Sequence, residues 1–118
     1  MRYKVERAVS VDRDLEAIFD FLTHSYIAFG ESKSEALDHA AARIEAIQDA
    51  METLGKTPHI GTLRPDLPPG FRAVSQDRTI FYFETDDEAQ RVRILAVFFG
   101  GQDHRRAMLK RLLGTDSD

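Results

Sequence analysis

Two isolated arginines and one aromatic pair are the first candidates for a functional surface in this sequence. Arg72 directly follows Phe71 at the start of a predicted strand, and Arg78 falls in the turn that comes next. A guanidinium group binds phosphate or carboxylate oxygens with paired hydrogen bonds, although a solvated arginine at a strand end is equally common. Phe98 and Phe99 are neighbours in a later predicted strand. One of the two rings therefore belongs to the core, and the other can act as an exposed binding anchor.

A basic cluster follows at His104, Arg105 and Arg106, with Lys110 one helical turn further on. Cations in the first turn of a helix are slightly unfavourable, because the helix N-terminus already carries partial positive charge. This arrangement indicates either an anionic partner or a solvated helix surface. His104 has no evident partner in the sequence that would orient it as a general base, so no catalytic residue is predicted.

The composition argues against several kinds of site. Without cysteine the chain has neither disulfides nor a thiolate metal site. Its four histidines lack metal-ligand spacing, so we expect no metal and no cofactor. No apolar run is long enough to span a bilayer, and the charged start of the chain is unlike a signal peptide. We therefore expect a cytoplasmic protein without a membrane partner.

Charge is distributed unevenly along the 118 residues, which carry a net charge of −4. Residues 1–55 contain 6 Lys and Arg against 11 Asp and Glu, whereas residues 71–113 contain 8 against 6. Proteins that act through phosphate contacts usually have a much larger positive excess. The balance therefore argues against a surface that binds nucleic acid alone. The length predicts one domain over residues 1–118.

The elements that must position these residues begin with a short strand and a helix. Residues 3–9 alternate between apolar and polar side chains, as a half-buried strand does. Ser10 or Asp12 is the expected cap of a helix that ends near Phe29 and Gly30. The apolar residues of this helix recur at helical spacing at Leu15, Ile18, Phe19, Leu22 and Tyr26.

A second helix follows with almost no gap. Ser32 and Glu35 have the spacing of a capping box, and Gly55 ends the helix. Its single apolar stripe is formed by Leu37, Ala40, Ile44, Ile47, Met51 and Leu54. One narrow stripe predicts packing against the first helix as a hairpin. Residues 55–70, with four prolines and three glycines, are expected to form a loop.

The second half of the chain predicts an antiparallel meander and a final helix. The first strand starts at Phe71, turns lie at 76–78 and 85–88, and the last strand covers 92–99. Strict alternation places Ile94, Ala96 and Phe98 on one face of the last strand and Leu95, Val97 and Phe99 on the other. Asp103 is the expected cap of the final helix. The apolar face of that helix is expected to be Met108, Leu109 and Leu112. The predicted class is α+β.

This order of elements resembles the RelE/ParE family of bacterial toxins from type II toxin–antitoxin systems. The family pattern is a first strand, a helical hairpin, a three-stranded antiparallel meander and a C-terminal helix. The residues that carry the resemblance are Asp14-Leu15 with Ile18, Pro58 with Ile60-Gly61, Gly70-Phe71-Arg72, Ile80-Phe81-Tyr82, Val97-Phe98-Phe99-Gly100 and Gln102-Asp103. The resemblance covers nearly the whole length and implies the same fold.

The resemblance implies one of two activities. RelE-like members are ribosome-dependent mRNA endonucleases, whereas ParE-like members bind DNA gyrase and poison replication. Residues 72–75 offer one basic residue where the endonucleases tend to have two, and Gly101-Gln102 replaces an expected Arg or Lys. No tyrosine follows Tyr82. These differences favour gyrase inhibition. A non-standard endonuclease set of Arg72, Arg78, His104 and Arg105, or a member that has lost toxicity, remains as an alternative.

The resemblance also implies two partners, a gyrase target and a ParD-like antitoxin, with nucleic acid involved only through gyrase or the ribosome. The expected target-binding residues are Arg72, Arg78, Phe99, His104, Arg105, Arg106 and Lys110. The expected antitoxin-binding residues are Phe21, Tyr26, Ile27 and Phe29. The alternative for this second cluster is that it only closes the core beneath the hairpin loop.

Overall fold

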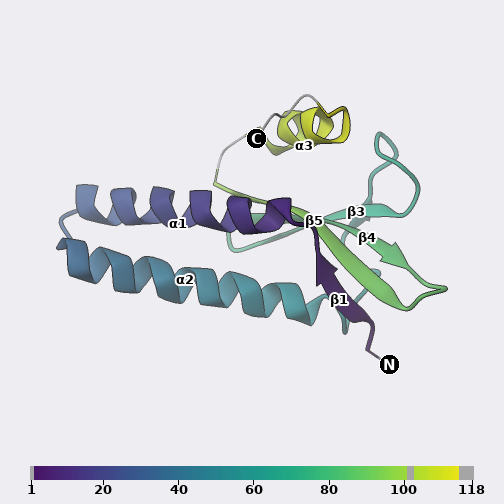
Figure 1. The fold of residues 1–118 in the computed structure, drawn as a ribbon, viewed down its shortest axis with the longest axis horizontal. Helices are drawn as coiled ribbons and strands as arrows, with labels where there is room; N and C mark the ends of the chain where they lie inside the picture. The colour runs from purple at the N-terminus through teal and green to yellow at the C-terminus, as the bar shows by residue number, and fades with distance from the viewer. Residues whose placement is uncertain (1, 101–102, 115–118) are drawn as a thin grey trace.

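A helical hairpin and a five-stranded sheet make up the frame of the molecule (Figure 1). The computed structural model describes residues 2–100 and 103–114. Its elements are β1 (Lys4–Arg7), α1 (Ser10–Ala28), α2 (Lys33–Thr53), β2 (Thr62–Leu63), β3 (Phe71–Gln76), β4 (Thr79–Asp86), β5 (Arg91–Phe99) and α3 (His104–Leu112). The predicted α+β class and order of elements are confirmed.

The sheet has the strand order β1-β5-β4-β3-β2. β1 pairs with β5 in parallel, and the remaining pairs are antiparallel. Strand β2 lies within the segment that was predicted to be a loop, and its two residues pair with Arg72 and Ala73 of β3. Two residues between proline-rich segments are too few to give an alternating pattern, so the sequence does not predict this strand.

The ends of the two helices follow local sequence rules, with one exception. The capping box is present, since Ser32 and Glu35 each accept a hydrogen bond from the other's backbone N–H. Gly30 ends the hairpin turn with a φ of 107°. The predicted caps of α1 are wrong: Val9 occupies the N-cap position and no side chain caps it. The backbone of Val9 is already helical, so the chain passes almost directly from β1 into α1 and leaves Ser10 inside the helix.

The hairpin covers one face of the sheet and forms the larger core. Buried side chains of α1 and α2, such as Leu15 and Met51, pack there against Phe81 and Phe83 of β4. Each buried side chain of this size stabilises the fold by about 1.5–3 kcal/mol. The predicted stripe of α2 is buried at Ala40, Ile47, Met51 and Leu54 and partly buried at Ile44, whereas Leu37 is exposed. The hairpin extends well past the edge of the sheet, which accounts for the exposure near its tip (Figure 1).

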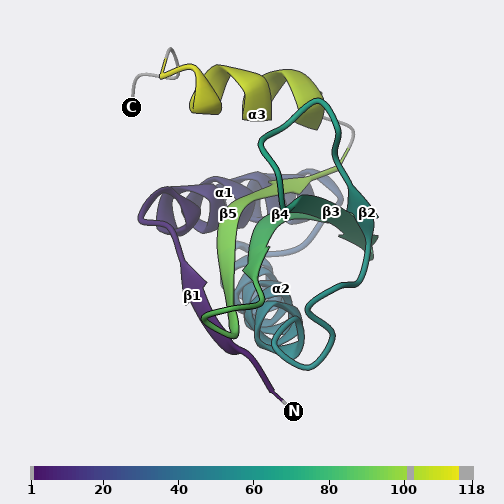
Figure 2. The ribbon, with the colours of Figure 1, turned by 90° about the vertical axis from the view of Figure 1, so that its right-hand side faces the viewer.

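The opposite face of the sheet carries a second, smaller core under α3 (Figure 2). Its buried members are Tyr82, Ala96, Phe98 and Met108. The Asp103 side chain caps α3 as predicted, by accepting a hydrogen bond from the Arg106 backbone. The predicted apolar face of α3 is only partly correct, because Met108 is buried but Leu109 and Leu112 are about 40% exposed. Among the described residues no helix is long and apolar enough to cross a membrane.

A β-bulge in β5 changes which of its residues face each of the two cores. Tyr82 pairs with Ala96, but the next residue of β4, Phe83, pairs with Ile94, so Leu95 is an extra residue on β5. Ile94 consequently faces the hairpin together with Val97, whereas Ala96 belongs to the core under α3. The prediction that Ile94 shares a face with Ala96 is therefore wrong, because strict alternation does not continue through a bulge.

An ion pair between Asp14 of α1 and Arg111 of α3 spans this bulge. The two side chains form paired hydrogen bonds of 2.8 and 2.9 Å. The Asp14 carboxylate also accepts from the Val97 backbone N–H at 3.0 Å, and the Arg111 guanidinium donates to the Leu95 carbonyl at 3.2 Å. Both charged groups thereby bind backbone groups beside the bulge, and α1, β5 and α3 are joined at one point.

We expect loss of either partner to destabilise the protein, because the other charge would stay largely buried without compensation. Asp14→Ala and Arg111→Ala should each lower the free energy of unfolding by about 2–4 kcal/mol. The double variant should lose less than the sum of the two, by about 1 kcal/mol or more. Urea denaturation measures these values. Arg13→Ala, at an exposed position on the same helix, should change stability by less than about 0.5 kcal/mol.

Candidate functional site

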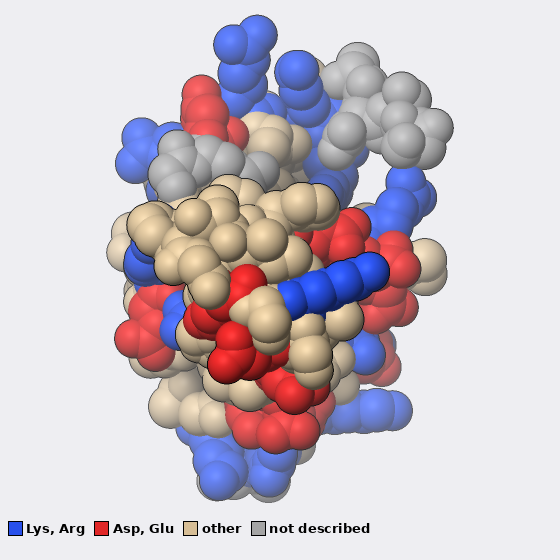
Figure 3. Space-filling view, turned by 90° about the vertical axis from the view of Figure 1, so that its left-hand side faces the viewer, with Lys and Arg blue, Asp and Glu red and all other residues tan. Residues whose placement is uncertain are grey.

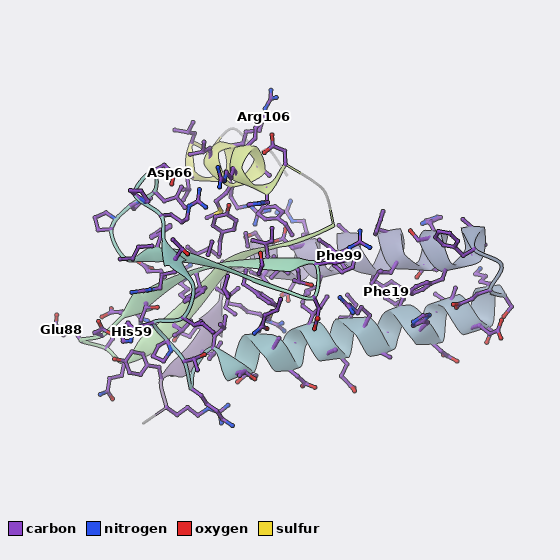
Figure 4. All side chains as sticks on the ribbon, turned by 180° about the vertical axis from the view of Figure 1, so that it is seen from behind. Phe19, His59, Asp66, Glu88, Phe99 and Arg106 are labelled. Carbon is purple, nitrogen blue, oxygen red and sulfur yellow. The ribbon has the colours of Figure 1, made fainter. Side chains whose placement is uncertain are left out.

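Phe99, the last residue of β5 (Figure 4), lies beside two guanidinium groups. The guanidinium carbons of Arg43 and Arg78 are 5.4 and 5.6 Å from the centre of its ring. At these distances the cations interact favourably with the negative face of the ring. Phe21 of α1 approaches the same ring, with the two ring centres 6.1 Å apart. Four segments distant in sequence, namely α1, α2, the β3–β4 turn and β5, thus place two arginines and two aromatic rings together.

The turn between β3 and β4 positions Arg78. Asp77 and Arg78 have φ values of 48° and 67°, and Gln76 pairs with Thr79, which together define a two-residue hairpin turn of type I′. The Arg78 carbonyl accepts a hydrogen bond from the Gly100 backbone N–H at 2.9 Å. The Arg43 guanidinium donates to the Asp77 carbonyl. Hydrogen bonds to backbone carbonyls of this turn therefore hold both Arg78 and Arg43 in position beside the Phe99 ring.

An open cleft of about 550 Å³ lies next to this ring. We call it the Phe99 cleft; its wall is mainly apolar and its lining residues are Asp14, Ala17, Ile18, Phe21, Arg78, Val97, Phe98, Phe99, Gly100, Ala107 and Arg111. Phe21 is 53% exposed at its edge. Asp14 and Arg111 neutralise each other, which leaves Arg78 as the charged group at the rim. The cleft is suited to an apolar side chain with a carboxylate or phosphate nearby.

A second group of titratable residues lies under α3. The Tyr82 hydroxyl and the His104 Nδ1 are 2.7 Å apart. Burial raises the pKa of the Tyr82 phenol above its ordinary value. Burial, and then the positive charges of Arg105 and Arg64, lower the pKa of the His104 imidazole. The phenol can donate to an unprotonated Nδ1, or its oxygen can accept from Nδ1–H in the other neutral tautomer, so the pair suits neutral His104 in either form.

The predicted target-binding residues fall into three places. Arg78 and Phe99 meet at the Phe99 cleft. The predicted cluster on α3, namely His104, Arg105, Arg106 and Lys110, lies on a separate layer across the sheet. Arg72 is near the other end of β3 from Arg78, and its guanidinium donates to the His59 carbonyl at 2.9 Å. Gly101 and Gln102 lie outside the described residues.

The predicted antitoxin-binding residues are also divided. Phe21 borders the Phe99 cleft. Tyr26 packs against the hairpin core and stacks on His39, with ring centres 3.8 Å apart. Ile27 and Phe29 are exposed by 42% and 89% near the hairpin tip. Tyr26 thus has the core-closing position that was weighed as the alternative, while the other three are accessible.

The sequence does not predict four residues of these two clusters: Arg43, Arg64, Asp14 in its ion pair, and Tyr82 as the partner of His104. Arg43 lies on α2 and meets Phe99 only through the fold, so no local pattern marks it. Tyr82 appeared as part of a strand motif, and its hydroxyl would have been a signal, since a buried tyrosine usually finds a polar partner. Within residues 2–100 and 103–114 no three His, Cys, Asp or Glu side chains gather closely enough to hold a metal.

The strand, hairpin, meander and final helix define a small α+β domain with the fold of the RelE/ParE toxins. A chain of the chromosomal ParDE toxin–antitoxin system from P. aeruginosa matches with a TM-score of 0.61 and 18% identity, over 84% of this chain and 97% of that one. A chain of the RelBE2 toxin–antitoxin complex from Mycobacterium tuberculosis matches with a TM-score of 0.56 and 16% identity, over 84% and 99%. The isolated E. coli RelE toxin gives 0.50 and 13%, over 93% and 98%.

No protein-family model matches the sequence, and no curated protein matches it. At these identities the likeness is one of fold. The predicted RelE/ParE fold is therefore confirmed by three-dimensional structure.

The depressed pKa of His104 has a consequence for stability. The unfolded chain takes up the proton at its ordinary value near 6.5, whereas the folded protein does so at lower pH. The contribution of His104 is therefore complete above pH 6.5 and is lost as the pH falls through the folded pKa. We expect His104→Gln to reduce the loss of unfolding free energy on acidification. Urea denaturation of both proteins at about pH 7.5 and about pH 5 measures it, and equal losses would contradict the expectation.

Proposed function

We propose that this chain is the toxin of a type II toxin–antitoxin system and that it acts in the cytoplasm by binding DNA gyrase. The observation that carries the proposal is the Phe99 cleft, where an aromatic ring flanked by Arg43 and Arg78 adjoins an apolar wall. Aromatic and arginine side chains around an apolar pocket are typical of residues that dominate protein interfaces. The likeness in fold to a chain of a ParDE system supports the same class of activity.

In this mechanism the chain supplies a binding surface and performs no bond chemistry. Phe99 and Arg78 would anchor the target, and the exposed arginines of α3 would add attraction to the acidic surface of a gyrase–DNA complex. A ligand of this kind shifts an enzyme toward the state that it binds more tightly. A toxin that prefers the cleaved state would therefore accumulate broken DNA.

The antitoxin is the second proposed partner. A ParD-like segment that folds on binding would lay an apolar helix face against Phe21 and the Phe99 cleft, and could extend to Ile27 and Phe29 at the hairpin tip. Because Phe99 also belongs to the proposed target surface, antitoxin and target would compete for it. Competition of this type explains neutralisation without any change in the fold.

We expect the purified protein to inhibit supercoiling by gyrase and to accumulate linear plasmid DNA. Phe99→Ala and Arg78→Ala should each weaken inhibition by about tenfold or more, as loss of a central anchor does. Arg72→Ala should weaken it less, because the Arg72 guanidinium binds the loop carbonyl of His59. Arg93→Ala, at an exposed position on β5, the strand that carries Phe99, is the matched control and should inhibit normally.

Unaffected gyrase would contradict this target. Filamentation with DNA damage signalling in expressing cells would agree with it. A folded, antitoxin-free protein that neither blocks gyrase nor slows growth would instead favour a member that has lost toxicity.

A ribosome-dependent endonuclease is the second candidate, and the Tyr82–His104 pair favours it. The set of endonuclease residues predicted from the sequence, Arg72, Arg78, His104 and Arg105, does not come together in the fold. The Arg72 guanidinium binds the loop carbonyl of His59 at one end of β3, and Arg78 lies beyond the other end of the strand. Instead His104 is within 2.7 Å of Tyr82 and close enough to Arg64 and Arg105 for both charges to lower its pKa. In the neutral tautomer whose Nδ1–H donates to the Tyr82 oxygen, the His104 Nε2 is free to accept a 2′-hydroxyl proton, and two guanidinium groups can stabilise a phosphorane.

For this candidate we expect programmed ribosomes to have their mRNA cleaved by the wild-type protein. His104→Ala should reduce the cleavage rate by about 100-fold or more, as removal of a general base does. The Phe99→Ala variant should cleave at the wild-type rate, because the Phe99 ring packs on the hairpin side of the sheet, away from the Tyr82–His104 pair under α3. Rapid cleavage by the His104 variant would exclude this site.

A further inference from the structure

The outer surface of α3 is both apolar and basic. Leu109, Leu112 and Leu113 are exposed by 41%, 40% and 75%. Arg106 and Lys110 lie on the same outward side, four positions apart. Figure 4 shows Arg106 pointing away from the molecule. A nine-residue helix that exposes two leucines beside cations, with a third exposed leucine at its C-cap, has the pattern of a helix that docks into a groove.

A groove of complementary character lies between α1 and α2. It measures about 600 Å³ and has an apolar floor of Leu15, Phe19 and Ile44. Its rim on α1 is formed by Asp12, Glu16 and Asp20, and Gln48 completes the lining. Carboxylates four residues apart on a helix repel one another, so this rim is slightly unfavourable in the isolated chain. Over the part of the chain that the structure describes, the carboxylates of Glu16 and Asp20 have no ion-pair partner.

The two surfaces match in charge and in spacing. Glu16 and Asp20 are one helical turn apart, as are Arg106 and Lys110, so two helices can pair both sets at once. The exposed leucines of α3 then face the apolar floor of the groove. Figure 3, which views the molecule from the hairpin end, shows basic side chains gathered over α3 and acidic ones over the hairpin.

The groove is not filled by the chain's own α3. Asp14, Ile18 and Phe21 line the Phe99 cleft on the flank of α1 that carries α3, whereas the groove uses Glu16 and Asp20 on the other flank. Figures 1 and 2 show α3 lying across α1 from α2. The complementary helix must therefore come from another molecule.

We propose that two copies of this chain associate by placing the outer face of α3 of each copy in the acidic groove of the other. Two such contacts related by a two-fold axis close into a dimer, whereas a single contact would propagate into chains. The dimer would cover Arg106 and Lys110, so it would hide the basic surface of α3. The proposal does not depend on the proposed function, because its test measures the molecular mass of the protein in solution and not its toxicity.

Sedimentation equilibrium of the purified full chain over a wide concentration range tests the proposal. The mass should rise from 13.4 kDa toward twice that value as concentration increases. Reversing the groove with Glu16→Lys and Asp20→Lys should weaken association at least about tenfold. Reversing the helix with Arg106→Glu and Lys110→Glu should do the same. The control, Glu45→Lys with Asp49→Lys, changes the same charges on α2 outside the groove lining and should associate normally.

Recombining the changes makes the test specific. A mixture of the groove-reversed and helix-reversed proteins should form a one-to-one dimer, because each reversed surface then meets its complement. The chain that carries all four changes should also regain association. Leu109→Gln should weaken association while keeping both charge sets, which separates docking from simple attraction. Circular dichroism confirms that each variant is folded.

Three outcomes would overturn the proposal. The first is a wild-type protein that stays at 13.4 kDa at every concentration. The second is a groove-reversed protein that associates as tightly as the wild type. The third is a folded mixture of the two reversed proteins that forms no dimer.

Discussion

The bidentate contact between Asp14 and Arg111 is the interaction on which the rest of the molecule depends. It joins the first helix to the last across 97 positions of sequence, and it satisfies backbone groups on both sides of a β-bulge. A bulge leaves ladder hydrogen bonds unmade, and unpaired backbone groups in a core are costly. The ion pair therefore stabilises the irregular strand and holds the helix that covers it.

The bulge in turn determines which residues of β5 reach the Phe99 cleft. With the extra residue at Leu95, Val97 faces the hairpin, and Phe99 two positions later emerges at the end of the strand beside Arg43 and Arg78. Phe98 remains in the smaller core, where the Arg111 guanidinium lies 5.5 Å from its ring centre. The Phe99 cleft and the support for α3 thus derive from neighbouring residues on opposite faces of one strand.

The ends of several helices could be predicted from the sequence, because each end depends on hydrogen bonds and backbone conformation within one helical turn. The capping box at Ser32, the stop at Gly30 and the cap at Asp103 each depend on residues within one turn. The candidate site was less accessible to such rules. Tertiary packing alone brings Arg43 to Phe99, and Arg64 and Tyr82 to His104. The bulge at Leu95 places Ile94 on the face of the sheet opposite to the expected one. Alternation is a reliable guide only while the ladder is regular.

The parallel pairing of β1 with β5 has a consequence for how the chain acquires its shape during synthesis. Lys4 to Arg7 are synthesised long before their partners Arg91 to Ile94. Contacts so far apart in sequence form late and slow the folding reaction. Most of the chain must therefore be synthesised before the central strands have both neighbours, and α3 can be held only once Arg111 is in place. The nascent chain therefore cannot complete its five-stranded sheet before Arg91 to Ile94 have been synthesised.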